Sequence, residues 1–158
     1  MTRAYVGLGA NLGDARATLA DAVGRLAQAP GVRLAVVSST WRTAPVDATG
    51  PDFFNAVAAL DTTLDARDLL ATLHAIEQAH GRERPYRNAP RTLDLDLLLY
   101  GDAVIDTPDL AVPHPRLQQR AFVLAPLLEI APRVVHPRLG PLAPYLGRVL
   151  DQTIEKLP

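Results

Sequence analysis

The hydrophobic pattern of residues 1–100 predicts four strands and two helices. Alternating or β-branched runs predict strands at residues 4–9, 32–41, 53–61 and 91–100. Two further segments space their apolar residues three and four positions apart, which is typical of amphipathic helices. Their stripes are Leu19, Ala22, Val23 and Leu26, and then Leu69, Leu70, Leu73 and Ile76. Asp14 and Asp65 are expected to cap these helices at their N-termini.

The order β-α-β-β-α-β predicts an α+β, ferredoxin-like core, in which helices pack on an antiparallel sheet. Glycine and proline punctuate residues 43–52 and 82–90, which we expect to be loops. The rest is richer in proline and predicts a short, irregular and helical C-terminal extension, with helices at 122–131 and 144–150. We expect residues 1–158 to form one domain.

Two carboxylates stand out in the fourth strand. Asp94 and Asp96 share one face of it, because side chains two apart on a strand point the same way, while the neighbouring leucines point to the other face. Carboxylates this close repel one another unless a cation lies between them, and a hard cation such as Mg²⁺ prefers oxygen ligands. The residues upstream include four arginines, which suit phosphate: Arg82, Arg84, Arg87 and Arg91. Together these features favour an enzyme that acts on a nucleotide polyphosphate.

Composition narrows the function classes. A net charge of −1 argues against broad, non-specific binding of nucleic acid, and the absence of cysteine excludes disulfides and Cys-ligated zinc. No apolar run approaches the ~20 residues of a membrane span, and the N-terminus has no secretory signal. We therefore expect a cytoplasmic protein that contacts neither membrane nor nucleic acid.

Other motifs are weaker. The glycines of residues 7–13 do not have dinucleotide-binding spacing, and we interpret them as a tight strand-to-helix turn. The chain has two serines, Ser38 and Ser39, and neither lies in a nucleophile elbow. The four histidines lack the spacing of a metal motif. His114 lies between two prolines, where a functional role and a solvated surface position both stay open. Glu77 could orient an arginine or lie at a solvated helix edge.

Taken together, several segments resemble the 6-hydroxymethyl-7,8-dihydropterin pyrophosphokinase family of folate biosynthesis. The most specific are the Pro-Arg-Thr-Leu-Asp-Leu-Asp run and the later Pro-His and Arg-x-Phe pairs, in this order and spacing. The matching segments are Tyr5–Asp14, Ser38–Thr43, Pro51–Ala56, Gly81–Arg82, Pro90–Asp96, Val112–Arg116 and Arg120–Leu124.

The resemblance implies a Mg²⁺-dependent transfer of diphosphate from ATP to the hydroxymethyl group of the pterin, releasing AMP. Asp94 and Asp96 would hold two Mg²⁺ ions. Arg82 and Arg91 would clamp phosphates. The remaining roles that it implies are ATP contacts for Arg84, Arg87, His114 and Arg120, and a pterin pocket formed by Thr43, Val46, Phe53, Asn55 and Phe122.

The physical properties of these residues agree with such roles. Phe53 and Phe122 could stack on a flat bicyclic ring, and Asn55 offers both a donor and an acceptor to its amide-like edge. Asn88 stands where members of the family can carry tryptophan, and Phe53 where tyrosine is also found. The expected partners are ATP and 6-hydroxymethyl-7,8-dihydropterin, and the protein is expected to be a monomer.

Two other functions compete with this interpretation. A ferredoxin-like RNA-binding module would need exposed aromatics on its central strands, and only 5% of this chain is aromatic. A metal-dependent phosphodiesterase would be consistent with the Asp pair alone, but it would need neither a pterin pocket nor ATP.

Overall fold

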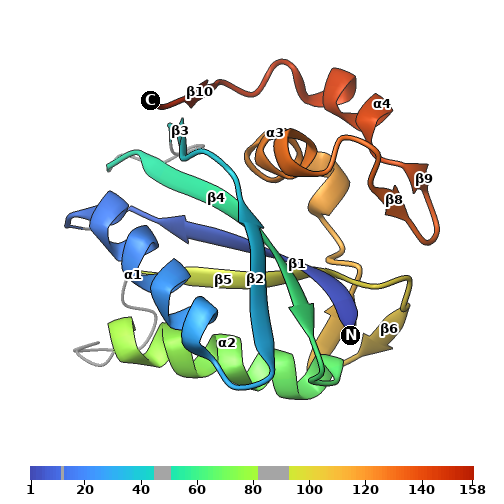
Figure 1. Ribbon diagram of the computed structural model, residues 1–158. Helices are drawn as coiled ribbons and strands as arrows, with labels where there is room; N and C mark the ends of the chain where they lie inside the picture. Colours follow the sequence, from blue (N-terminus) through green and yellow to red (C-terminus); the bar gives the residue numbers. More distant parts are fainter. Residues whose placement is uncertain (12, 45–50, 82–92) are drawn as a thin grey trace.

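The computed structural model describes residues 1–11, 13–44, 51–81 and 93–158, and Figure 1 shows their arrangement. The strands are β1 Thr2–Ala10, β2 Val32–Val37, β3 Trp41–Thr43, β4 Phe53–Thr62, β5 Asp94–Tyr100, β6 Ile105–Thr107, β7 Leu110–Val112, β8 Val135–His136, β9 Gly140–Pro141 and β10 Ile154–Lys156. The α-helices are α1 Ala15–Gln28, α2 Ala66–Gly81, α3 Ala121–Ile130 and α4 Ala143–Leu146, with single 3₁₀ turns at Leu117–Gln119 and Gly147–Val149. In the described ranges no helix is long and apolar enough to cross a membrane.

The main sheet is antiparallel and has the order β10-β3-β4-β1-β5, with β2 also pairing with β4. The fold is therefore a mixed α/β fold built on an antiparallel sheet, as the sequence predicts. β1 lies between β4 and β5 and pairs with β4 along its whole length, from Thr2 opposite Thr62 to Ala10 opposite Phe54. The end of β1 therefore lies beside the starts of β4 and β5, at one end of the sheet, where Phe53, Asn55, Asp94 and Asp96 lie.

The prediction of one continuous strand over residues 32–41 is wrong, because β2 and β3 are separated at residues 38–40. Ser38 causes this interruption. Its N–H donates to the Val57 carbonyl at 2.9 Å, while its hydroxyl accepts from the Val57 N–H at 2.9 Å and donates to the Ser39 carbonyl at 2.8 Å. A serine side chain thus takes over a backbone hydrogen bond of the ladder.

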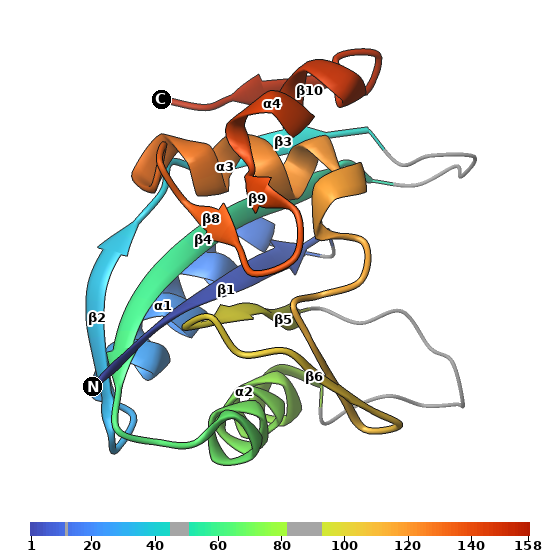
Figure 2. The same ribbon diagram turned by 90° about the vertical axis from the view of Figure 1, so that its right-hand side faces the viewer.

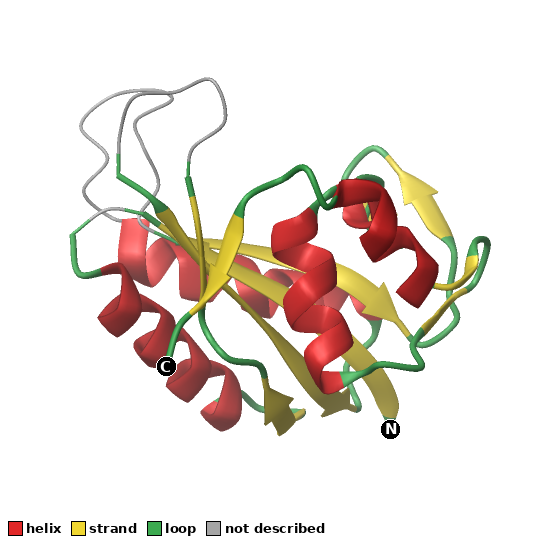
Figure 3. Ribbon diagram, turned by 90° about the horizontal axis from the view of Figure 1, so that it is seen from above, coloured by secondary structure: helices red, strands yellow, loops and turns green. Residues whose placement is uncertain are grey.

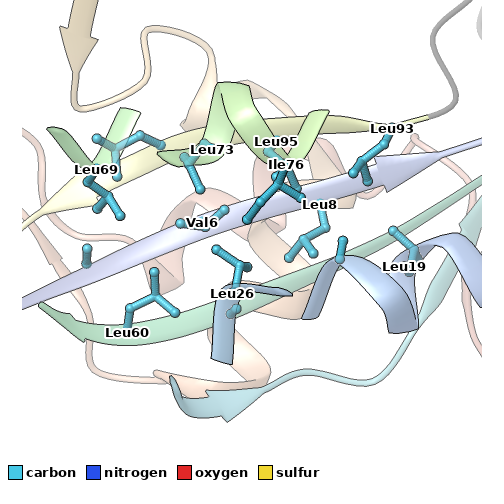
Figure 4. Close-up of a cluster of buried hydrophobic side chains, with 14 of the residues drawn as sticks. Val6, Leu8, Leu19, Leu26, Leu60, Leu69, Leu73, Ile76, Leu93 and Leu95 are labelled. Carbon is cyan, nitrogen blue, oxygen red and sulfur yellow. The ribbon is translucent and has the colours of Figure 1, made fainter. Parts of the chain in front are cut away.

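Helices α1 and α2 cover one face of the sheet, and Figure 4 shows the apolar cluster between them. Asp14 caps α1, since its carboxylate accepts from the Ala17 N–H at 3.1 Å. The residues of both predicted stripes are buried in this cluster, except Val23 and Leu70, which are half-buried at the margin of the cluster. The labelled cluster contains Val6, Leu8, Leu60 and Leu95 from the sheet and Leu19, Leu26, Leu69, Leu73 and Ile76 from the helices.

The opposite face is covered by α3 and the segments that follow it, so the sheet lies between two helical layers (Figure 3). Val57, Leu98 and Leu99 of the sheet pack there against Leu124 and Leu127 of α3. The predicted helix at 122–131 is confirmed as α3, while the one expected at 144–150 is divided into α4 and a 3₁₀ turn. The C-terminal extension therefore forms the second layer of the core.

The register between β1 and β5 shifts in the middle of β5. Val6 is opposite Leu97 and Tyr5 is opposite Leu99, so Leu98 is skipped. This extra residue turns both Leu98 and Leu99 toward the α3 layer, which explains why alternation ends there in the sequence. The carbonyl of Leu98 accepts from the His114 N–H at 2.9 Å, which draws the chain after β7 toward the Asp pair.

Candidate active site

Asp94 and Asp96 lie at the start of β5, half-buried, on the face away from α1 and α2. They stand opposite Gly9 and Gly7 of β1, respectively. Because a glycine has no side chain, the sheet face beside the carboxylates is left open. Gly7 and Gly9 lie in β1, within the strand predicted over residues 4–9, so the interpretation of the glycines as a strand-to-helix turn holds for Gly13 alone, with φ of 59°. Glycines two apart within a strand pattern were the overlooked signal.

A cavity of about 740 Å³ opens above these glycines. It is bordered by six segments: the ends of β1 and β3, the starts of β4 and β5, the region from His114 to α3, and the C-terminal segment that leads into β10. The predicted site residues that line it are Thr43, Phe53, Asn55, Asp94, Asp96, His114, Arg120 and Phe122.

A smaller cavity of about 180 Å³ lies between α2, β5 and β7. His74 and Glu77 of α2 line it, together with Leu110. Asp94, Asp96 and His114 border both cavities. The carboxylate pair therefore stands between two separate spaces, which suits a group that joins two ligands.

Asn55 and Thr43 form the polar wall of the larger cavity. They are 6% and 8% exposed, and the Asn55 side-chain NH₂ donates to the Thr43 hydroxyl at 3.2 Å. Asn55 Oδ1 lies 3.1 Å from the position that a Cβ on Gly9 would take. The amide thus occupies space that exists only because residue 9 is glycine.

Phe122 and Arg120 enter the cavity from the N-terminus of α3, and Phe53 enters from the start of β4. The Arg120 guanidinium lies 5.4 Å from the centre of the Phe122 ring, within the range of a cation–π contact. The structure therefore brings the two predicted aromatic residues into one cavity beside a fixed positive charge.

His114 is half-buried and borders both cavities, which favours a functional role over simple solvation. Burial lowers the pKa of His114, the charge of Asp96 raises it, and Arg120 and Arg116 lower it, so that it lies below its ordinary value. The imidazole is then neutral at pH 7. Nδ1 accepts from the Arg116 N–H at 3.2 Å, so the proton of the neutral ring is on Nε2.

Glu77 does not lie at a merely solvated helix edge. Its carboxylate accepts from the Leu95 N–H at 2.9 Å, at the residue between Asp94 and Asp96. This contact ties α2 to the start of β5. Sequence periodicity missed it because the contact depends on how α2 docks on the sheet.

Five predicted site residues lie outside the described residues: Val46, Arg82, Arg84, Arg87 and Arg91. Asn88 lies there as well. Their predicted roles consequently stay predictions.

The donor set fits Mg²⁺. Across the described ranges no group of three or more His, Asp or Glu side chains gathers to hold a metal. Asp94 and Asp96 still offer carboxylate oxygens on one face, and Mg²⁺ is commonly held by one or two carboxylates, with water and substrate phosphates completing its shell. The two carboxylates could therefore form part of such a shell, and both border the two cavities.

Known structures share this fold. An HPPK-DHPS crystal structure in complex with substrates superposes with a TM-score of 0.74 at 12% identity, covering 95% of this chain and 43% of that chain. Plasmodium falciparum HPPK-DHPS with pteroate gives a TM-score of 0.75 at 12% identity, covering 95% and 42%. The chain therefore spans less than half of these solved chains.

Known sequences are more closely similar. A 2-amino-4-hydroxy-6-hydroxymethyldihydropteridine pyrophosphokinase of Pseudomonas aeruginosa is 45% identical over 157 residues, which are 99% of this chain and 97% of that protein. The protein of the same name from Methylorubrum extorquens is 48% identical over 136 residues, covering 85% and 86%. The sequence profile of 7,8-dihydro-6-hydroxymethylpterin-pyrophosphokinase (HPPK) matches residues 5–132. On this similarity over most of its length, the chain belongs to the 7,8-dihydro-6-hydroxymethylpterin-pyrophosphokinase family.

Proposed function

We propose that this chain transfers diphosphate from ATP to the hydroxymethyl group of 6-hydroxymethyl-7,8-dihydropterin, releasing AMP, in folate biosynthesis. Family membership supports the reaction. The observation that carries the assignment of the site is the Asp94–Asp96 pair standing between two cavities, because the reaction joins two substrates at one phosphorus.

The larger cavity is assigned to the pterin. Phe53 and Phe122 offer apolar ring faces to a flat bicyclic ligand. Asn55 and Thr43 offer amide and hydroxyl groups to its polar edge, where an unpaired ring nitrogen or oxygen would otherwise be costly to bury. Val46 completes this pocket in the prediction from sequence.

ATP is assigned to the side of the Asp pair near His114, reaching into the larger cavity at Arg120. His114 presents an Nε2–H donor near both carboxylates, and Arg120 provides a permanent positive charge at the border of the larger cavity. Both groups suit phosphate or ribose oxygens. Arg82 and Arg91 are proposed to clamp the phosphates, and Arg84 and Arg87 to contact ATP.

Asp94 and Asp96 would hold two Mg²⁺ ions, which when bound neutralise charge on the phosphates. The pterin hydroxyl oxygen attacks the β-phosphorus of ATP, a new P–O bond forms, and the bond between that phosphorus and the bridging oxygen of AMP breaks. The chain itself orients the two substrates and supplies positive charge around the phosphates. We assign the hydroxyl proton to solvent, because Nδ1 of His114 already accepts a backbone N–H.

The finer description of the fold is also a proposal. The strand order β3-β4-β1-β5, with α1 and α2 on one face, supports a ferredoxin-like core to which α3 adds a second layer. That second layer argues against an RNA-binding module, because α3 covers the sheet face beside the cavity. A single domain, a monomer and a cytoplasmic location stay predictions.

The test is to incubate the purified protein with ATP, Mg²⁺ and the pterin and to measure AMP. We expect AMP that depends on the pterin and disappears when Mg²⁺ is chelated. Folded protein that releases no AMP would overturn the proposed reaction. Hydrolysis of a phosphodiester without pterin or ATP would favour the phosphodiesterase instead.

A further inference from the structure

We propose that Gln152 is a positioning residue for the reaction: its side-chain amide clamps the backbone on both sides of Arg120 and so sets Arg120 and Phe122 in the cavity wall. This inference rests on the proposed function. Gln152 lies beyond residues 5–132, the part of the chain that the family profile matches.

The clamp consists of two hydrogen bonds. The Gln152 side-chain oxygen accepts from the Ala121 N–H at 2.9 Å, and its NH₂ donates to the Gln119 carbonyl at 2.9 Å. Residue 120 lies between these two contacts. The Arg120 side chain is therefore attached at a point of the backbone that is held from both sides.

Helix α3 needs such a partner. Its N-cap residue is Arg120, whose side chain makes no capping hydrogen bond. The first N–H groups of a helix have no partner within the helix, and Ala121 is only 2% exposed, so water cannot readily replace one. Gln152 supplies the missing acceptor from 31 residues away.

Gln152 is itself held in place. Its N–H donates to the Val149 carbonyl at 3.1 Å. Two residues later the chain enters β10, where Ile154 pairs with Thr43 of β3. Figure 2 shows β10 passing over α3 beside β3. The clamp thus joins the wall that carries Thr43 to the wall that carries Phe122.

The test uses three variants of the full chain. Gln152→Ala removes both contacts, while Gln152→Glu keeps an acceptor for the Ala121 N–H, where the helix N-terminus also favours a negative charge. Thr62→Val is the matched control. The buried Thr62 hydroxyl also makes two contacts with backbone, donating to the Gly31 carbonyl at 2.6 Å and accepting from the Leu64 N–H at 3.0 Å. It lies at the far end of β4, about 30 Å along the strand from Phe53.

Gln152→Ala is expected to raise the KM for the pterin and for ATP about fivefold, because the two lost contacts position Arg120 and Phe122, with kcat within about twofold. Hydrogen exchange at the Ala121 amide should become faster in this variant. Gln152→Glu should restore most of that protection, and Thr62→Val should change neither KM nor the exchange at Ala121.

An unchanged KM in Gln152→Ala would overturn the inference, and so would an equal rise in Thr62→Val, because general loosening would then explain it. Failure of the proposed function is recognised separately, since the unmodified chain would then release no pterin-dependent AMP. Exchange at Ala121 would still show whether Gln152 holds the start of α3.

Discussion

Asp96→Asn should abolish most of the activity while leaving the fold intact. Asparagine has nearly the same shape as aspartate but lacks its charge, and Asp96 is half-buried on an open sheet face opposite Gly7. We therefore expect the free energy of unfolding to change by less than about 0.5 kcal/mol.

The size of the catalytic loss follows from the loss of one negative charge beside a bound cation. One carboxylate and a doubly charged Mg²⁺ about 4 Å apart interact by about 8 kcal/mol at an effective dielectric constant near 20. If half of that interaction is made only in the transition state, kcat/KM falls about a thousandfold. The assay is the rate of AMP release at saturating Mg²⁺, with Asp102→Asn, an exposed residue in the turn after β5, as the control.

A second measurement on the same variant tests the geometry alone. The Asp96 charge raises the pKa of His114 in the structure, so its removal should lower that pKa further. An NMR titration of His114 in metal-free protein would measure this. The reasoning is refuted if Asp96→Asn keeps activity within tenfold of the unmodified chain, or if the pKa of His114 does not fall.

Three further predictions concern the surroundings of the site and the second helical layer. Gly9→Ala should raise the KM for the pterin about tenfold, because its Cβ would come within 3.1 Å of Asn55 Oδ1, whereas a Cβ on Gly7 would meet its nearest neighbour at 3.5 Å and should have a smaller effect. Glu129→Ala should lower the free energy of unfolding by about 1.5 kcal/mol, measured by urea denaturation, because this carboxylate accepts three hydrogen bonds from the β2–β3 region. As the pH falls below 6.5, the ordinary histidine pKa, the free energy of unfolding should also decrease. Burial and then the charge of Arg138 lower the pKa of His136 in the folded chain, so the unfolded chain binds the proton first.

Each of these predictions has its own control. Equal effects of the two glycine variants would contradict the contact with Asn55. For Glu129, the control is Glu155→Ala, which removes an exposed ion pair with Arg42 and should cost at most about 1 kcal/mol. For His136, the fall should be reduced in His136→Asn, which lacks a titrating ring. Full stability should hold above pH 6.5, and an unchanged fall below it in the variant would assign the effect to another group.

Local order was accessible from the sequence, because it depends on neighbours a few residues apart. The apolar residues from Leu19 to Leu26 and from Leu69 to Ile76 lie on one face of each helix, whatever surface the helix packs against. The alternation at Asp94 and Asp96 places both carboxylates on one face of any strand. The spacing of the longer motifs was sufficient to identify the family.

The prediction over residues 32–41 failed for the opposite reason. Nothing in its β-branched pattern shows that the Ser38 hydroxyl will replace a ladder hydrogen bond with Val57. The C-terminal extension was likewise underestimated. Its apolar residues form a second core layer only because Leu98 and Leu99 turn toward α3 through the register shift in β5.

The sequence by itself indicated most of the strands and helices of residues 1–100, the apolar faces of the two predicted helices and the candidate site residues, because these follow from periodicity and from motifs. Only the tertiary structure decided that Gly7 and Gly9 would stand beside the carboxylates, that His114 would border both cavities, and that Gln152 would hold the start of α3. The physical reason is register. A shift of one residue between strands moves every side chain to the other face, and that pairing is set by packing between segments distant in the chain.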